Sequence, residues 1–129
     1  MNILMVCYSG GFEHSYLPDA EVAIKRLGKE QGWKVVTTHL LRLLAPERLN
    51  EFDLLIMATT GNLPLSDAEK EGLLSFVRNG KGLVGIHNAA DTGYDWAEYG
   101  EMLGGYFKAH PWRQEITVIV EDTDHTATR

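Results

Sequence analysis

The sequence predicts an α/β fold, specifically a flavodoxin-like three-layer α/β/α sandwich with a mainly parallel sheet. Two observations support this prediction. Short apolar runs, which are typical of strands buried on both faces, alternate with segments whose apolar residues recur at helical spacing. Strict alternation of strand and helix implies a parallel sheet with helices on both of its faces. The length of 129 residues fits one domain, which we expect to comprise residues 1–129.

The apolar runs predict five strands. The first run is closed by Ser9-Gly10-Gly11, the third by Thr59-Thr60-Gly61, and the fourth leads directly into His87. The fifth alternates in part between apolar and polar residues, so we expect it nearer an edge of the sheet. In chain order the strands are expected at Ile3–Tyr8, Trp33–Thr38, Asp53–Ala58, Gly82–Ile86 and Gln114–Val120.

Helix signals fill the segments between these strands. Pro18 suits the first turn of a helix that Gly32 would end. Ser66-Asp67-Ala68-Glu69 is a capping box, in which the serine hydroxyl and the glutamate carboxylate accept hydrogen bonds from backbone N–H groups at a helix start. Asp95 to Glu98 shows the same pattern before a helix that Gly104-Gly105 would end, and a short helical turn is expected near Pro46 to Asn50.

Charge and composition argue against two classes of partner. The formal net charge is −6 and the basic residues around Lys25 cover only one helix surface, so nucleic acid is not expected to bind. No basic region precedes the apolar N-terminus and no apolar run is long enough to span a bilayer, which predicts a cytoplasmic protein without a membrane partner. The single cysteine, Cys7, cannot form an internal disulfide and fits a reducing compartment.

The end of the chain differs from the rest. Residues 124–129 have loop composition, and nothing follows them to cover the last predicted strand or to close the sheet. We therefore expect a C-terminally truncated sequence and a partial domain.

Candidate site residues lie where predicted strands end. Parallel strands place their carboxyl ends at one edge of the sheet, where open α/β sheets bind ligands. His87 follows the fourth strand and is a candidate general acid/base or metal ligand, which Asp91 could orient. The structural alternative is a histidine that only caps the strand end. Glu13 and His14 follow the first strand and are candidates for substrate binding.

Three further residues extend the candidate site. His110 lies after the Gly104-Gly105 break, and His125 lies in an acidic loop; with His87 and Asp91 they are the catalytic candidates. Tyr94 belongs to a group of aromatic residues on which a sugar ring could stack, so we assign it to substrate binding. We predict that the four histidines at positions 14, 87, 110 and 125 converge at the carboxyl edge of one sheet.

A divalent metal such as zinc would suit this set of residue types, because neutral imidazoles and a carboxylate are ligands for such metals. The spacing adds little, since no two histidines stand at the separation of a known metal motif. The sequence therefore leaves the cofactor unassigned.

Several short motifs, taken in order, resemble the ThuA-like (trehalose utilisation) family. Each is weak alone, but the ordered set extends through nearly the whole chain. Thr126 departs from the family pattern, which usually has proline after that histidine. The motifs are Gly10-Gly11-Phe12-Glu13-His14, Gly85-Ile86-His87 with Asp91, Trp96 and Tyr99 before Leu103-Gly104-Gly105-Tyr106-Phe107, His110-Pro111, and Asp124-His125 with Ala127-Thr128.

The resemblance implies a fold like that of class I glutamine amidotransferases, a link to trehalose and related sugars, and longer relatives. In amidotransferases of this fold a nucleophilic cysteine occupies a sharp strand-to-helix turn, and here His87 stands at that place. Glutamine hydrolysis by a cysteine is therefore not expected, because Cys7 lies inside the first strand. We expect an enzyme acting on a sugar or oxidised sugar with His87 as acid/base. The alternatives are a non-catalytic carbohydrate-binding or regulatory domain and, less favoured, an amide hydrolase; the sequence leaves a homo-oligomer open.

Overall fold

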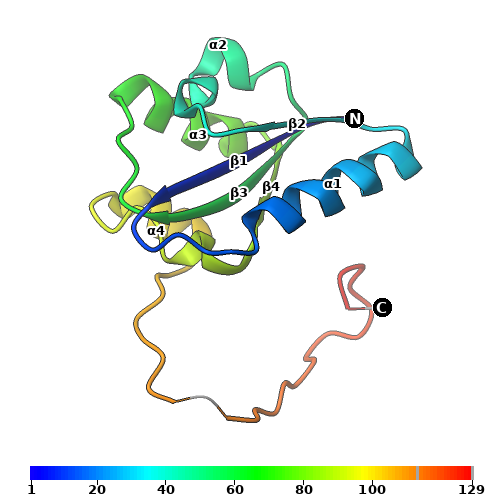
Figure 1. Cartoon of the computed structure of the whole chain (residues 1–129), viewed down its shortest axis with the longest axis vertical. Helices are drawn as coiled ribbons and strands as arrows, with labels where there is room; N and C mark the ends of the chain where they lie inside the picture. Colours follow the sequence, from blue (N-terminus) through cyan, green and yellow to red (C-terminus); the bar gives the residue numbers. More distant parts are fainter. Residues whose placement is uncertain (113, 129) are drawn as a thin grey trace.

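A four-stranded sheet forms the centre of the molecule. The structure is a computed structural model, and it describes residues 1–112 and 114–128. The strands are β1 (Asn2–Gly10), β2 (Lys34–Thr38), β3 (Leu54–Gly61) and β4 (Gly82–Gly85), and the order across the sheet is β2-β1-β3-β4. All three neighbouring pairs are parallel, so the carboxyl ends of the strands lie at one edge, called the carboxyl edge below (Figure 1).

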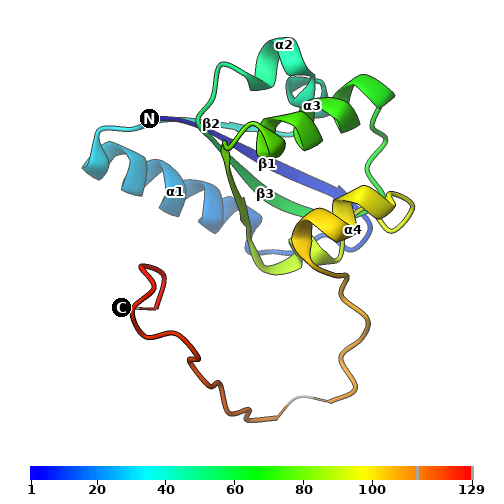
Figure 2. The ribbon, with the colours of Figure 1, turned by 180° about the vertical axis from the view of Figure 1, so that it is seen from behind.

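Helices cover both faces of this sheet, which confirms the three-layer prediction. α1 (Leu17–Gln31) lies on one face, whereas α2 (Pro46–Leu49), α3 (Asp67–Arg78) and α4 (Ala97–Leu103) lie on the other (Figures 1 and 2). Two short 3₁₀ helices, η1 (Leu41–Leu44) and η2 (His87–Ala90), lead into α2 and follow β4, respectively. No helix among the described residues is both long and apolar enough to cross a membrane.

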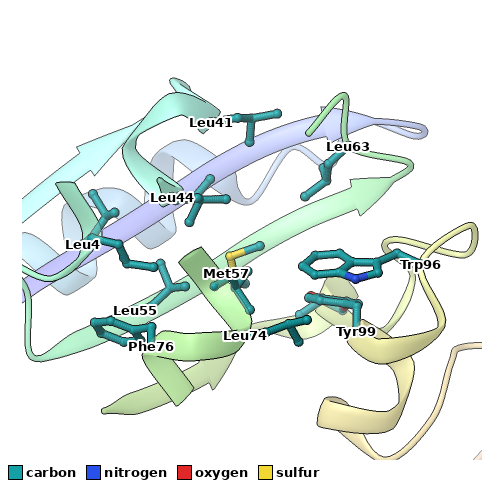
Figure 3. Packing of buried hydrophobic residues seen from close by; sticks show 14 residues of the cluster. Leu4, Leu41, Leu44, Leu55, Met57, Leu63, Leu74, Phe76, Trp96 and Tyr99 are labelled. Atoms are coloured by element: carbon teal, nitrogen blue, oxygen red, sulfur yellow. The ribbon is translucent and has the colours of Figure 1, made fainter. Parts of the chain in front are cut away.

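Each face of the sheet has its own hydrophobic core, because successive residues of a strand point to opposite faces. Figure 3 shows the larger core, in which Leu4 and Met57 of the sheet pack against α3 and against Trp96 and Tyr99. On the α1 face, residues that include Met5 and Cys7 form the smaller core. The two central strands, β1 and β3, are thus buried on both sides, as their continuous apolar runs predicted.

The helix termini show where local sequence signals decide the structure and where they do not. Gly32 ends α1 with φ of 68°, and Ser66 and Glu69 form the predicted capping box of α3. The cap predicted at Asp95 is wrong, since Trp96 is the N-cap residue of α4 and no side chain caps the helix. Packing replaces the cap there: the rings of Trp96 and Tyr99 stack at 5.4 Å and both are buried.

The fifth strand, predicted at Gln114–Val120, does not form. These residues are exposed and have no strand partner, and the chain after α4 runs away from the sheet (Figures 1 and 2). A strand-like sequence becomes a strand only when a neighbouring edge accepts its backbone hydrogen bonds. Among the described residues the outer edges of β2 and β4 are unpaired, but this segment pairs with neither, so Ile116 and Val118 remain 72% and 76% exposed.

Candidate functional site

The carboxyl edge of the sheet carries a small cleft. His14 reaches it from the loop after β1, whereas His87, Asn88 and Asp91 reach it from the turn after β4. Phe107 and His110 complete the lining from the segment after α4, and the enclosed volume is about 70 Å³. Ligands of open α/β sheets bind at this edge, so the cleft lies where the fold places a site.

His87 occupies a strained turn between β4 and η2. Its φ is 52°, and among the described residues it is the non-glycine residue with positive φ. Such a conformation costs about 1–3 kcal/mol and persists only where the surroundings impose it. The turn is tight, because a Cβ on Gly85 would lie only 2.9 Å from Cβ of Ala89. The sequence placed His87 correctly at the strand end but did not reveal this strain.

Two of the predicted histidines are in direct ring contact. The imidazoles of His14 and His87 lie edge to face with ring centroids 4.7 Å apart, and the Tyr16 ring meets His87 in the same manner at 5.2 Å. The His110 ring also lines the cleft and lies against the Phe107 ring, with ring centroids 4.6 Å apart. Three imidazoles therefore line one cleft.

Asp91 is held by Tyr94 rather than by His87. The Tyr94 hydroxyl donates to Oδ1 of Asp91 at 2.6 Å and also lies 2.8 Å from the Phe107 carbonyl oxygen. This hydrogen bond to the carboxylate raises the pKa of Tyr94 to about 12, so its hydroxyl remains a donor. The Asp91 carbonyl accepts from the Gly61 amide at 2.7 Å, which fixes the loop beside β3. The carboxylate is thus oriented before any ligand binds.

A buried polar network supports the turn from below, and the sequence analysis missed it. Asn88 is 6% exposed and donates through Nδ2 to the Thr59 carbonyl at 2.8 Å. Its Oδ1 accepts from the Tyr16 hydroxyl, and the Thr92 hydroxyl donates to the same Thr59 carbonyl. Asn88 directly after the candidate histidine was the available signal, because a polar residue next to a buried strand end needs partners.

The remaining candidates lie outside the cleft lining. Glu13 is exposed in the first loop. His125 is exposed in a C-terminal turn, where its Nδ1 accepts from the Ala127 amide at 3.1 Å. The structure therefore brings together three of the four histidines that we expected to converge, namely His14, His87 and His110, and leaves His125 apart.

Neither a cysteine nucleophile nor a metal cluster is found among the described residues. Cys7 is buried in β1, and burial, followed by the nearby Glu21 carboxylate, raises the pKa of its thiol to about 12. A thiol in that state is a poor nucleophile, in agreement with the prediction that Cys7 is a core residue. Within residues 1–112 and 114–128, no three His, Cys, Asp or Glu side chains are grouped so that they could hold a metal ion.

The parallel sheet with helices on both faces defines an α/β protein, and this fold is consistent with the class I glutamine amidotransferase-like superfamily. The family model ThuA, described as trehalose utilisation, matches residues 2–129. The chain belongs to the ThuA family.

One solved structure resembles the chain closely. It is a ThuA-like protein from Bacteroides uniformis ATCC 8492, with a TM-score of 0.78 and 28% sequence identity over 98% of this chain. The match covers 54% of that protein, so the chain spans about half of its length. No curated protein matches the chain.

Proposed function

We propose that this chain carries a histidine-centred site that acts on a sugar or an oxidised sugar by general acid/base chemistry. The observation that supports it most directly is the left-handed backbone of His87, which presents the imidazole to a cleft at the carboxyl edge. Backbone strain in folded proteins clusters at active sites and ligand clamps. The family description, trehalose utilisation, favours a sugar over other small molecules.

In this proposal His87 exchanges a proton with a bound sugar hydroxyl. A neutral ring nitrogen accepts the hydroxyl proton, and the resulting imidazolium returns it to the product. His14 stands in ring contact with His87 and provides a second imidazole for the same substrate edge. Asp91, whose carboxylate Tyr94 orients, accepts a hydrogen bond from a neighbouring hydroxyl, and His110, also in the cleft lining, binds a further hydroxyl.

The size of the cleft limits which part of the substrate enters it. Its volume of about 70 Å³ is well below the roughly 300–1,000 Å³ of pockets that bury a whole drug-sized ligand. The cleft of this chain therefore admits the reacting edge of a sugar ring, and the rest of the substrate lies outside it.

The test is His87→Gln, assayed with trehalose, glucose and a ketohexose as substrates. Glutamine keeps the Cβ and a hydrogen-bonding end but does not exchange protons near neutral pH. We expect turnover to fall by about 10²- to 10⁴-fold while the melting temperature changes little. The matched control is His39→Gln, because His39 is exposed after β2, its Nε2 lies 3.7 Å from Oε1 of Glu21, and it does not line the cleft.

Two outcomes would contradict the acid/base proposal. One is full turnover in His87→Gln. The other is sugar binding without turnover in the wild-type protein, with equal affinity in His87→Gln, measured by NMR titration. The second result would favour a non-catalytic carbohydrate-binding domain, in which the imidazole has no proton to transfer.

We further propose that the protein is cytoplasmic. Cys7 is a free, buried thiol, and free thiols are usual in reducing compartments. Cell fractionation with an antibody to the chain would check this location, and recovery with secreted protein would contradict it.

A further inference from the structure

Tyr16 links the first loop to the turn that carries His87. It is the N-cap residue of α1, and its ring meets the His14 ring at 5.8 Å and the His87 ring at 5.2 Å. Its hydroxyl donates to Oδ1 of Asn88, the residue directly after His87. One side chain therefore contacts the candidate acid/base by its ring and the supporting asparagine by its hydroxyl, across 72 residues of sequence.

Asn88 transmits this contact to the sheet. Its Nδ2 donates to the Thr59 carbonyl in β3, and its own carbonyl accepts from the Asp91 amide at 2.9 Å. The Ile86 amide donates to the Met57 carbonyl at 2.9 Å on the other side of His87. The left-handed residue is thus held between two anchored neighbours, and the Tyr16 hydroxyl completes the hydrogen bonding of the Asn88 side chain.

We propose that Tyr16 is a positioning residue, which holds His87 in its left-handed conformation through the hydrogen bond to Asn88. Tyr16 does not line the cleft, so it acts on the imidazole rather than on a ligand. The importance of Tyr16 for catalysis rests on the proposed function of His87. Its effect on the conformation of His87 can be measured without any substrate. Strain that the backbone alone would relax requires such an external constraint.

The decisive variant is Tyr16→Phe, which keeps the ring contact with His87 and removes only the hydroxyl. Loss of one neutral hydrogen bond shifts a local equilibrium about fivefold, so the turn should open more often. We expect hydrogen exchange of the Asp91 amide, which is bonded to the Asn88 carbonyl, to accelerate about fivefold relative to the Trp33 amide, which is bonded to the Gly28 carbonyl, measured by NMR. The NMR chemical shifts of the His87 backbone should move as well.

Tyr8→Phe is the matched control. Tyr8 also lies at the carboxyl end of a strand and packs against the larger core, but the described residues give its hydroxyl no hydrogen-bond partner. Tyr8→Phe should leave the ratio of the Asp91 to the Trp33 exchange rate unchanged. A ratio and His87 shifts in Tyr16→Phe equal to those of the wild type would overturn the proposal, as would equal changes in both variants.

A measurement on the wild-type protein keeps the proposal testable if Tyr16→Phe does not fold. A hydroxyl proton bound to Asn88 exchanges slowly and should give an NMR resonance with a nuclear Overhauser contact to the Asn88 side chain. A Tyr16 hydroxyl that exchanges freely with water would overturn the assignment. If His87→Gln keeps full turnover while the Tyr16 results hold, the proposed function fails and the positioning role stands.

Discussion

At the scale of single residues, His87 combines an unfavourable backbone with a functional side chain. Its φ of 52° is one that glycine adopts more readily than any residue with a Cβ. The energetic cost is borne because neighbouring groups fix the turn: Asn88 is hydrogen-bonded to β3, and Gly85 allows the close approach of η2. A residue whose conformation opposes stability is a candidate for a residue retained for chemistry.

His87→Gly should therefore stabilise the protein. Glycine removes the Cβ that makes positive φ costly, and the net gain in the free energy of unfolding should be roughly 0.5–1 kcal/mol after its larger backbone entropy is subtracted. Urea denaturation monitored by tryptophan fluorescence measures this difference. His39→Gly is the control, because its φ is not positive and glycine there should lower stability. Equal losses in both variants would show that the strain at His87 is negligible.

Cys7 should resist alkylation in the folded protein. Burial raises the pKa of its thiol from 9.0 to about 12, so the folded chain keeps a proton that the unfolded chain releases in that interval. The stability due to the protonated thiol is complete below pH 9 and falls as the pH rises towards 12. Iodoacetamide should label the thiol rapidly in urea but slowly without it between about pH 8 and pH 10. Rapid labelling of the folded chain would contradict the buried, protonated state.

At the scale of elements, close approach between backbones determines several positions. In α3, a Cβ on Gly72 would lie 2.0 Å from the Leu44 carbonyl oxygen and 2.9 Å from the Pro46 nitrogen. This glycine lets α3 pack directly on η1 and α2. It explains why a residue that is unfavourable in helices stands in the middle of one.

Gly72→Ala should consequently destabilise the protein, although alanine is the better helix former by about 1 kcal/mol. Overpacking against a carbonyl in a buried contact should lower the free energy of unfolding by about 1–3 kcal/mol. Ser75→Ala, three residues along the same helix, should change stability by less. Thermal melting by circular dichroism distinguishes the two. A Gly72→Ala variant more stable than the wild type would mean that α3 can shift away from Leu44.

Local patterns predicted the elements whose determinants are local. The strands β1 and β3 and the capping box at Ser66 are examples. A continuous apolar run indicates burial on both faces, and the capping box needs only residues three positions apart. The fifth strand failed, since pairing depends on a partner edge that no periodicity reveals. The position of His87 was predictable from the fold, but its support by Tyr16 and Asn88 was not. These two residues are 72 positions apart, and no local sequence pattern indicates a hydrogen bond between them.

At the scale of the whole molecule, apolar surface is distributed unevenly. The two cores are well covered, whereas Ile116, Val118 and Ile119 are largely exposed in the segment after α4, and Val84 is 43% exposed in β4, at one end of the sheet order. Exposed stretches with strand-forming sequences and free sheet edges are sites of self-association.

Replacing Val118 and Ile119 together by lysine should therefore reduce self-association of this chain. Charge in the middle of an apolar, strand-forming stretch opposes intermolecular pairing. Light scattering over a range of protein concentrations should show less aggregate than the wild type, with an unchanged melting temperature because these side chains contact neither core. The control for charge alone replaces two exposed residues outside this segment, Gln31 and Asn50, by lysine. Equal scattering by the double variant and the wild type would remove this segment from the association surface.

The strand order β2-β1-β3-β4 also determines when the cleft can form during synthesis. β1 is synthesised first, yet it lies between two strands that are synthesised later. The cleft next to His14 cannot form until His87 and His110, which also line it, have been synthesised. At about 5–20 residues per second, the interval between the synthesis of His14 and that of His110 is about 5–20 seconds. The nascent first loop is therefore exposed for all of this time, and the cleft is among the last features of the chain to form.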